Sequence, residues 1–389
     1  LRDERHTALR VLERRTVTER AFPQWDMLSP VLVTAEIDDL RRRIYQLDQE
    51  ILRLVNERID RAKEVGALKS ESGDKVVYCP EREAQILHRL AEINSGPLRP
   101  AQLQTIFREV ISIARAAESL PRVAVLGPAG TYSQAAVLKH FGREVEPLFG
   151  DDIEDVFRLV ESREADHGVV PVENSTEGGI SNTLDCLVTT ALCITGEVSL
   201  RISHSLVGKT QERELAKTVL GHEQALAQCR NWLDRHLPAL QRVAVSSNAE
   251  AARQASENPV CVAVAGIETA EIYGLELLEQ GIEDQPGNTT RFFVIGSEWA
   301  GVSGRDKTSL LLSSHNRAGS LQRLLAPLSE NGISMSRIES RPSRTGLWEY
   351  IFFIDLEGHV NDEIVQKALA AIEQEAALFK VLGSYPRAI

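Results

Sequence analysis

The stretch that decides the first part of the fold is IDDLRRRIYQLDQEILRLVNERIDRAKEVGALK, residues 37–69. Neither Gly nor Pro occurs in it before Gly66, and apolar residues recur at intervals of three and four: Ile37, Leu40, Ile44, Leu47, Ile51 and Leu54. This spacing places the apolar side chains on one face of an α-helix. It predicts one long amphipathic helix of about ten turns.

The helical pattern continues to about Leu120, so residues 35–120 are predicted to form one helical domain. Two shorter helices are expected at 80–93 and 100–118, each opened by a proline, which suits a first helical turn. Three helices with one so long cannot bury their apolar faces alone, which favours a helix-swapped dimer. Residues 1–34 show no apolar periodicity and are expected to be a poorly ordered extension, with Met27 a possible start site.

The composition limits the classes of function. A chain of 389 residues is expected to divide into two or three domains. Its net charge of -12 argues against nucleic-acid or membrane-surface binding, so an anionic ligand would need local positive charge. Five widely spaced cysteines without a C-x-x-C pair indicate reduced thiols in a cytoplasmic protein and no metal site, and no apolar run has the length of a membrane span.

Residues 121–297 follow a different pattern, in which short Val- and Ile-rich runs such as RVAVLG, HGVVPV and PVCVAVA alternate with helical segments. This alternation predicts an α/β domain. The antiparallel-looking stretch from Cys193 to Gly208 interrupts it. We therefore expect two lobes joined by crossing strands, as in periplasmic binding proteins.

A Gly- and Ser-containing linker leads to a third unit at residues 307–387. The expected elements are strands at 308–313, 333–341 and 348–356, helices at 320–331 and 362–377, and a short strand at 380–382. This β-α-β-β-α-β order is ferredoxin-like. Small modules of this kind usually pair their sheets and bind a ligand at the seam.

Cations lie where the long helix should present apolar residues. Extending the heptad of Ile37 and Ile44 reaches Arg58, and Lys69 returns to nearly the same face. A solvated stripe is the alternative interpretation. Arg41 and the pair Arg82-Glu83 add to the set, and desolvated cations without matching carboxylates need an anion. The pattern therefore predicts a small dianionic ligand.

The long-helix sequence, with VYCPEREAQIL after it, resembles the all-helical chorismate mutase family, which forms an intertwined dimer. The resemblance implies that Arg58 and Arg82, with Arg41 from the partner chain, hold the two carboxylates of chorismate. It also implies that Lys69 donates a hydrogen bond to the ether oxygen and that Glu83 binds the ring hydroxyl. The reaction is an intramolecular Claisen rearrangement, so the protein must only select the reactive conformer and stabilise charge on the ether oxygen.

The sequence departs from that family at three positions: Cys79 stands where an Asp is often found, Ala114 replaces a small polar residue, and Glu118 stands where some relatives carry Gln. An ionised Glu118 would repel the ether oxygen. We therefore expect Glu118 to act in its protonated form beside Lys69, with its pKa raised by burial or its charge offset by Lys69.

Two motifs in the α/β segment place polar groups beside predicted strands. VAVLGPAGTYSQAA offers amides and the hydroxyls of Thr131, Tyr132 and Ser133 at a helix start, without the glycine and lysine spacing of ATP or NAD sites. In VVPVENSTEGGIS, four polar residues follow a buried strand: Glu173, Asn174, Ser175 and Thr176. Ligands of α/β domains bind at such strand ends, whereas a helix cap would explain only one of the four.

Together with GHEQALAQC, which contains His222 and Gln228, and NTTRFF at 288–293, these motifs resemble the prephenate dehydratase family. The resemblance implies a cleft between the lobes in which prephenate loses water and CO2 to give phenylpyruvate. Thr290 would protonate the departing ring hydroxyl or donate a hydrogen bond to it. The alternative interpretation of Thr290 is a threonine at the start of a strand that only caps a turn. The substrate-binding residues would be Ser133, Glu173, Asn174, Ser175, Gln228 and Arg291.

In the third unit, NRAGSLQRLLAPLSENGISMSRIESRP and KVLGSYP resemble the ACT regulatory domain. The resemblance implies that L-phenylalanine binds between two such domains, although the same seam could serve dimerisation alone. The expected contacts lie in a strand-to-helix turn and on the facing strand: Asn316, Ala318, Gly319, Ser320, Leu321, Glu339, Ser340 and Arg341.

The domain order resembles that of the bifunctional chorismate mutase/prephenate dehydratases of L-phenylalanine biosynthesis. The resemblance implies a homodimer or larger homo-oligomer, feedback inhibition by L-phenylalanine, and no cofactor or metal. One alternative is a monofunctional prephenate dehydratase whose helical domain serves only dimerisation. Another is a non-catalytic ligand sensor, because two-lobed α/β domains also occur in sensors.

Overall fold

The computed structural model describes residues 30–71, 78–209, 215–314, 317–342 and 350–388. Most of the expected N-terminal extension, including Met27, lies outside these ranges. The described chain forms two compact parts, one ending at Asn56 and one starting at Glu57. Among the described residues, no helix has the length and apolar character needed to cross a bilayer.

The long helix predicted from periodicity is present as α1, Pro30–Glu71, a single element of 42 residues. Its apolar face is open to solvent in the part up to Asn56, where Leu40, Ile44 and Leu47 are 58%, 57% and 58% exposed. Side chains of this type are normally buried, so this face of the helix lacks a partner within its own compact part.

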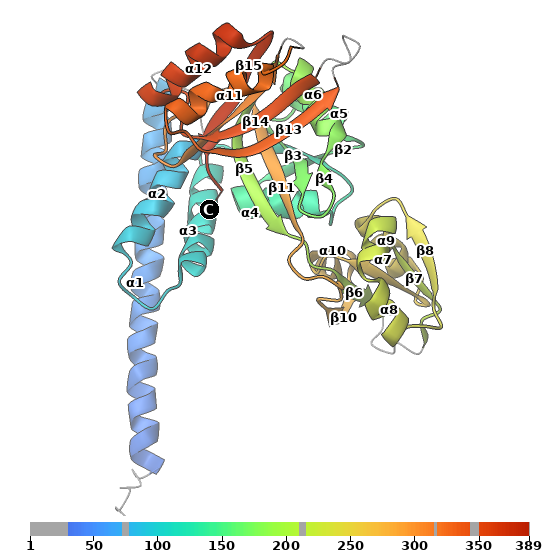
Figure 1. Cartoon of the computed structure of the whole chain (residues 1–389). Helices are drawn as coiled ribbons and strands as arrows, with labels where there is room; N and C mark the ends of the chain where they lie inside the picture. Colours follow the sequence, from blue (N-terminus) through green and yellow to red (C-terminus); the bar gives the residue numbers. More distant parts are fainter. Residues whose placement is uncertain (1–29, 72–77, 210–214, 315–316, 343–349, 389) are drawn as a thin grey trace, which may run out of the picture. The chain divides into compact units, whose positions relative to one another are not determined.

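The two shorter helices are α2, Pro80–Ile93, and α3, Pro100–Ala116 (Figure 1). Each begins with proline, whose fixed φ suits the first turn. At the start of α3, Arg99 and Gln102 form reciprocal capping bonds. Tyr78, just before α2, packs among Phe141 and apolar residues of the α/β domain, which anchors the helices to that domain.

The first lobe contains a sheet in the order β2-β1-β3-β11-β5, with β4 paired to β3. Its strands are β1 Arg122–Leu126, β2 Glu146–Gly150, β3 His167–Asn174, β4 Gly178–Gly179, β5 Cys193–Arg201 and β11 Thr289–Gly296. Its helices are α4 Tyr132–Phe141, α5 Ile153–Glu161 and α6 Ser181–Thr189. β1 runs parallel to β2 and β3, whereas β11 is antiparallel to both of its neighbours, β3 and β5.

The second lobe has the sheet order β10-β6-β9-β7-β8. Its strands are β6 Ser205–Gly208, β7 Thr218–His222, β8 Gln241–Val245, β9 Cys261–Ala265 and β10 Glu276–Gln280. Its helices are α7 Glu223–Gln228, α8 Arg230–His236, α9 Asn248–Glu257 and α10 Glu268–Tyr273. The chain crosses between lobes from β5 to β6 and returns from β10 to β11 (Figure 1), which confirms the predicted two-lobed arrangement.

The C-terminal module has the predicted ferredoxin-like topology, with an antiparallel sheet in the order β13-β14-β12-β15. Its elements are β12 Asp306–Ser313, α11 Ser320–Glu330, β13 Met335–Pro342, β14 Tyr350–Glu357, α12 Glu363–Glu375 and β15 Leu378–Pro386. The last strand is longer than the expected 380–382, because it pairs along the whole of β12. Trp348, the expected first residue of the third strand, lies outside the described residues.

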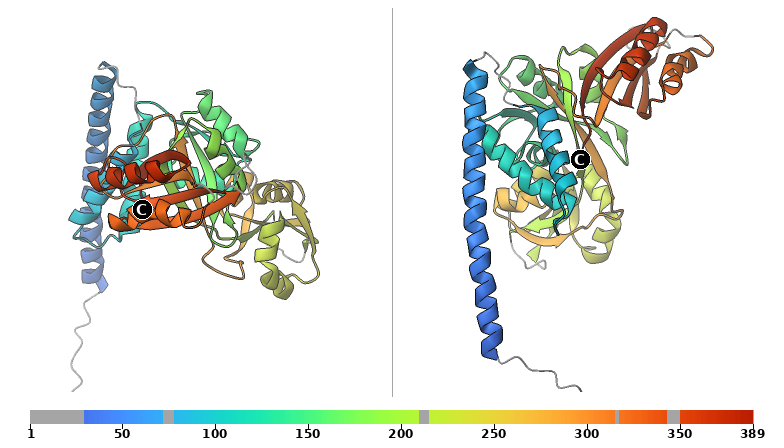
Figure 2. Two further views of the ribbon diagram at one scale, coloured as in Figure 1. Left: turned by 45° about the horizontal axis from the view of Figure 1, so that its top comes forward. Right: turned by 90° about the vertical axis from the view of Figure 1, so that its left-hand side faces the viewer.

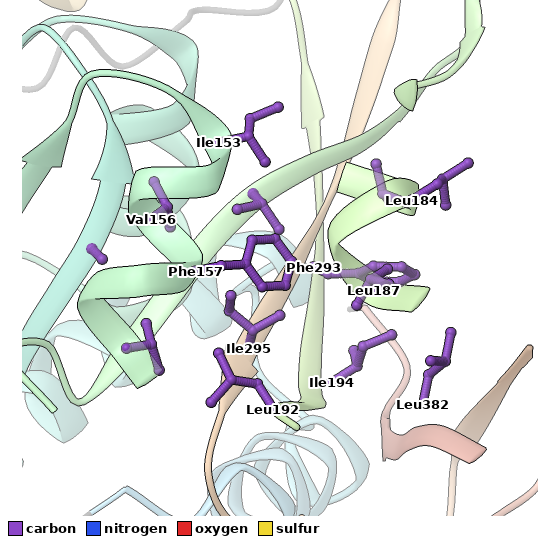
Figure 3. Close-up of a cluster of buried hydrophobic side chains, with 14 of the residues drawn as sticks. Ile153, Val156, Phe157, Leu184, Leu187, Leu192, Ile194, Phe293, Ile295 and Leu382 are labelled. Atoms are coloured by element: carbon purple, nitrogen blue, oxygen red, sulfur yellow. The ribbon is translucent and has the colours of Figure 1, made fainter. Parts of the chain in front are cut away.

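The two faces of this module have different partners (Figure 2). Leu310, Leu312 and Ile354 pack under α11 and α12. The alternate residues Leu311 and Phe353 instead join the core of the first lobe. Figure 3 shows Leu382 of β15 near Ile194 of β5 in this shared core.

A glycine permits the close approach of these two strands. An added Cβ at Gly383 of β15 would lie 2.1 Å from the carbonyl oxygen of Ile194 and 2.8 Å from its nitrogen. Real Cβ atoms do not approach backbone atoms so closely, so β15 requires glycine at this position to lie against β5. The C-terminal module is therefore part of the packing of the two-lobed domain.

Candidate active sites

A cavity of about 160 Å³ lies between the two lobes. Both lobes and the crossing segments line it with Tyr132, Ser133, Pro171, Asn174, Ile202, His204, His222, Gln224, Ala225, Gln228, Asn248, Asn288, Thr290 and Phe292. None of these described lining residues is Lys or Arg. An anion in this cavity would meet neutral donors and the N-terminus of α4.

Thr290 and Asn174 face each other across the β11–β3 ladder. The amide Nδ2 of Asn174 donates to Oγ1 of Thr290 at 2.8 Å. Its Oδ1 accepts from the backbone N–H of Thr176 at 3.0 Å, and this N–H fixes which end of the amide points to Thr290. Since the hydroxyl oxygen of Thr290 accepts from Asn174, its own proton is available for a ligand.

A second polar chain orients Gln228. Oε1 of Gln228 pairs with Nε2 of His204 at 2.8 Å and accepts from Nδ2 of Asn288 at 3.4 Å. Nδ1 of His204 pairs with the hydroxyl of Tyr132 at 2.8 Å. Burial lowers the pKa of His204 and raises the pKa of Tyr132 well above its ordinary value. Both groups are therefore neutral near pH 7, and they hold the amide of Gln228 rather than supply charge.

The expected prephenate contacts separate into two groups in the structure. Ser133, Asn174, Gln228 and Thr290 line the cavity together. Ser175 lies beside it, where its hydroxyl donates to Oδ1 of Asn288 at 3.2 Å.

Glu173 and Arg291 do not point into the cavity. They form the next pair of the same ladder, after Asn174 and Thr290. Successive side chains of a strand point to opposite faces of the sheet, so Glu173 and Arg291 lie on the face toward the C-terminal module. The expectation that they contact the substrate from within this cavity is therefore corrected by the structure.

The sequence motifs missed two polar residues of the cavity, His204 and Asn248, and they gave no role to Asn288, the first residue of NTTRFF. His204 and Asn288 lie in the segments where the chain crosses between lobes, far from Gln228 in sequence. The predicted crossing after Cys193 was the available signal, because residues at such junctions face the interlobe space.

Three of the residues expected to contact chorismate, Lys69, Glu118 and Arg58, make contacts in the described chain. Nζ of Lys69 donates to Sγ of Cys79 at 3.6 Å. Partial burial raises the pKa of Glu118, while Lys69 acts to lower it, which is the direction expected from the sequence. An added Cβ at Gly66 would meet the Glu118 side chain, so this carboxyl lies over α1. Nη1 of Arg58 donates to the carbonyl of Val110 at 3.4 Å.

The remaining expected chorismate contacts are arranged differently. The carboxylate of Glu83 is paired with the buried guanidinium of Arg115 on α3, and burial raises the pKa of Glu83. Arg82 is exposed. Arg41 lies in the compact part that ends at Asn56, where it pairs with Asp38 at 3.4 Å.

The expected phenylalanine contacts lie at one end of the ferredoxin-like sheet. Asn316 is outside the described residues. Ala318 and Gly319 precede α11, with Gly319 at φ 78° as its N-cap, and Ser320 and Leu321 begin the helix. Arg341 bonds the carbonyl of Ser181 at 2.7 Å and Asp185 at 3.1 Å. Glu339 lies against Gly179, so it faces the two-lobed domain as Arg341 does, while Ser340 is exposed.

Comparison with known proteins accounts for all three units. The chorismate mutase type II family model matches residues 40–119, the prephenate dehydratase model residues 123–300, and the ACT domain model residues 308–374. A bifunctional chorismate mutase/prephenate dehydratase from Neisseria gonorrhoeae is 49% identical over 360 residues, covering 91% of this chain and 99% of that protein.

This chain belongs to the bifunctional chorismate mutase/prephenate dehydratase family.

Another bifunctional chorismate mutase/prephenate dehydratase, from Aquifex aeolicus, is 40% identical and covers 91% of this chain and 99% of that protein. The crystal structure of a prephenate dehydratase in complex with L-Phe from Arthrobacter aurescens matches with a TM-score of 0.64 at 34% identity, over 69% of this chain and 90% of that one. The chain is thus a chorismate mutase and a prephenate dehydratase, with a C-terminal ACT domain.

Proposed function

We propose that this bifunctional enzyme makes phenylpyruvate for L-phenylalanine biosynthesis, and that dehydration occurs in the interlobe cavity with Thr290 as hydrogen-bond donor to the leaving hydroxyl. The observation that carries this assignment is the bond from Nδ2 of Asn174 to Oγ1 of Thr290, which directs the hydroxyl proton of Thr290 away from Asn174. The proposed domains are 35–120, 121–297 and 307–387, after an extension at 1–34.

In the dehydration, the ring carboxylate leaves as CO2 and its bonding electron pair enters the ring. The ring then expels its hydroxyl group, which leaves as water with a proton passed from Thr290 and regained from solvent. A threonine is a weak acid, but aromatisation supplies much of the driving force, so a well-placed donor suffices. A cavity with neutral lining also avoids stabilising the carboxylate that must lose its charge.

Prephenate is proposed to bind through neutral donors on both lobes. Ser133 and Asn174 come from the first lobe, and Gln228, oriented by His204 and Asn288, from the second. Ser175 supports this arrangement through Asn288. Glu173 and Arg291 are proposed to act from the opposite face of the sheet.

The mutase site is proposed to include Arg58, Lys69, Arg82, Glu83 and Glu118, completed by Arg41 from a second copy of the chain. The exposed apolar face of α1 supports such a homodimer, because pairing would bury it. Glu83 would have to exchange its bond to Arg115 in order to bind the ring hydroxyl. Lys69 and neutral Glu118 would stabilise charge on the ether oxygen.

L-phenylalanine is proposed to inhibit the enzyme by binding at the ACT domain, near Asn316, Ala318, Gly319, Ser320 and Leu321. The ACT match and the L-Phe complex of the Arthrobacter aurescens relative support this role. Ser340 is exposed for such contacts, whereas Glu339 and Arg341 would transmit binding to the segment before and within α6. Five free thiols support a cytoplasmic location.

The test supplies purified protein with chorismate alone and follows chorismate and phenylpyruvate, with and without L-phenylalanine. Phenylpyruvate that forms from chorismate and is suppressed by L-phenylalanine is the expected result. Conversion of added prephenate but not of chorismate would limit the helical domain to dimerisation. Binding of these acids without turnover would contradict the proposal and favour a sensor.

A further inference from the structure

The pair Thr290 and Asn174 has a charged counterpart on the other face of the sheet. In the antiparallel ladder of β11 and β3, Thr290 is paired with Asn174, and Arg291 with Glu173. The first pair faces the interlobe cavity. Because side chains alternate along a strand, the second pair points toward the ACT domain. Thr290 and Arg291 are adjacent in β11, and Asn174 and Glu173 are adjacent in β3. A displacement of one pair therefore displaces the backbone of the other.

Arg291 is held by both domains. Its Nε donates to Oε2 of Glu197 on β5 at 2.8 Å, and its Nη1 is paired with Oδ2 of Asp355 on β14. Its Nη2 donates to the hydroxyl of Tyr385 on β15 at 3.1 Å. The side chains of Glu197 and Asp355 are each 3% exposed, so the ACT domain supplies a buried partner to the residue next to Thr290.

Glu173 forms an ion pair with β13, an edge strand of the ACT sheet. Its Oε2 lies 3.3 Å from Nε of Arg337 on β13 and 3.9 Å from Nη1 of Arg291. Arg337 is also paired with Glu339 on the same strand. The side chain of Arg337 is 8% exposed, whereas that of Glu173 is 39% exposed, so the contact is buried on the ACT side and open to solvent on the side of β3. Three strands of the ACT sheet, β13, β14 and β15, therefore hold the pair Arg291 and Glu173.

Stability alone is a poor explanation for this arrangement. A buried ion pair costs desolvation and often contributes no more stability than apolar residues of similar size. Burial by itself would lower the pKa of Arg291, but Tyr385, Asp355 and Glu197 together raise it above its ordinary value, so its charge is kept in the folded protein. The ladder also shifts register between Arg291 and Phe292, so these contacts fix the backbone where the regular pairing is interrupted.

We propose that Arg291 and Glu173 are positioning residues of the prephenate dehydratase, through which the ACT sheet sets the placement of Thr290 and Asn174. The inference rests on the proposed role of Thr290. It makes the ACT domain a structural component of the dehydratase site even without effector. A ligand that displaced β13 or β14 would displace the pair that faces the substrate.

The test uses Asp355→Asn in the full-length protein, which removes a charge from the ACT side without touching the cavity. The matched control is Glu357→Gln on the same strand, which breaks an exposed ion pair with Arg387. We expect Asp355→Asn to lower kcat for prephenate about tenfold with KM within about twofold, and Glu357→Gln to leave both unchanged. Chorismate mutase activity, measured on the same samples, should be unchanged in both variants.

An Asp355→Asn protein with kcat within about twofold of wild type would overturn the inference. If that variant does not fold, Tyr385→Phe replaces it, because it removes no charge and only a hydroxyl, which bonds Arg291 and Ser309. It should lower kcat about threefold at unchanged KM, and a wild-type kcat would then refute the inference. An inactive wild-type protein would overturn the proposed function instead, so the two failures are distinguishable.

Discussion

The orientation of the Asn174 amide gives a prediction in which the more conservative substitution is the more harmful one. Asn174→Asp keeps the oxygen that accepts from Thr176 and replaces the N–H donor to Thr290 with a second carboxylate oxygen. That oxygen would accept the hydroxyl proton of Thr290, so the proton would no longer be available to the leaving hydroxyl. Asn174→Ala removes the bond but leaves the proton of Thr290 available.

The magnitudes follow from the hydrogen bonds involved. Losing the neutral bond in Asn174→Ala removes about 1 kcal/mol, or roughly a fivefold loss in kcat. A bond from the Thr290 hydroxyl to a carboxylate is worth about 1.5–3 kcal/mol, and breaking it in the transition state costs roughly 10- to 150-fold. Repulsion between the new charge and the dianionic substrate adds to that loss.

The assay is phenylpyruvate formation from saturating prephenate by each purified variant, with mutase activity as the internal control. Asn174→Asp should be slower than Asn174→Ala, and it should recover as the pH falls, because a protonated carboxyl can again donate to Thr290. Equal or greater activity in Asn174→Asp would refute the assigned direction of the bond.

Three further predictions follow from packing and from titrating groups. Gly383→Ala should lower the Tm and prephenate turnover while sparing the mutase, because the added Cβ would meet the Ile194 backbone at a cost of about 1–3 kcal/mol. The control is Gly96→Ala, whose Cβ would lie 3.6 Å from its nearest neighbour, Oδ1 of Asn94. An unchanged Tm for Gly383→Ala would contradict the close packing of β15 against β5. Mutase kcat/KM should fall as the pH rises through the raised pKa of Glu118, since only the neutral carboxyl can donate to the ether oxygen. Glu118→Gln should abolish this fall. A pH profile in that variant equal to the wild-type profile would exclude Glu118 as the titrating acid. Burial lowers the pKa of His167 to about 4, so protonation of this side chain favours the unfolded state. The free energy of unfolding should therefore drop by about 2 kcal/mol between pH 7 and pH 5. Urea unfolding of His167→Gln should show a smaller drop than the wild type, and an equal drop would assign the pH dependence to other groups.

The sequence was sufficient for the order of domains and for most elements, because each has its own periodicity. The heptads of residues 37–54 predicted α1, and the alternation of strands and helices predicted the α/β domain. The length of β15 was not predictable from its own residues, since Gly383 and Ser384 interrupt its apolar pattern. The strand is extended by pairing with β12, which is a tertiary effect.

The candidate site was predictable in residue type but only partly in geometry. Asn174 and Thr290 follow from motifs next to buried strands. The two-residue period of a strand implies that Arg291 does not share the face of Thr290, so the motif NTTRFF carries this information once the strand is recognised. The contacts of His204 and Asn288 with Gln228 could not be predicted, because they depend on how the two lobes cross.

The most direct test of the central claim is to give chorismate to the purified Thr290→Ala variant and follow chorismate, prephenate and phenylpyruvate together. The account predicts that chorismate disappears at the wild-type rate and prephenate accumulates, because the mutase residues are intact and the donor to the leaving hydroxyl is gone. Formation of phenylpyruvate at the wild-type rate would remove Thr290 from the mechanism. It would also show that dehydration does not depend on the pairing of Asn174 with Thr290.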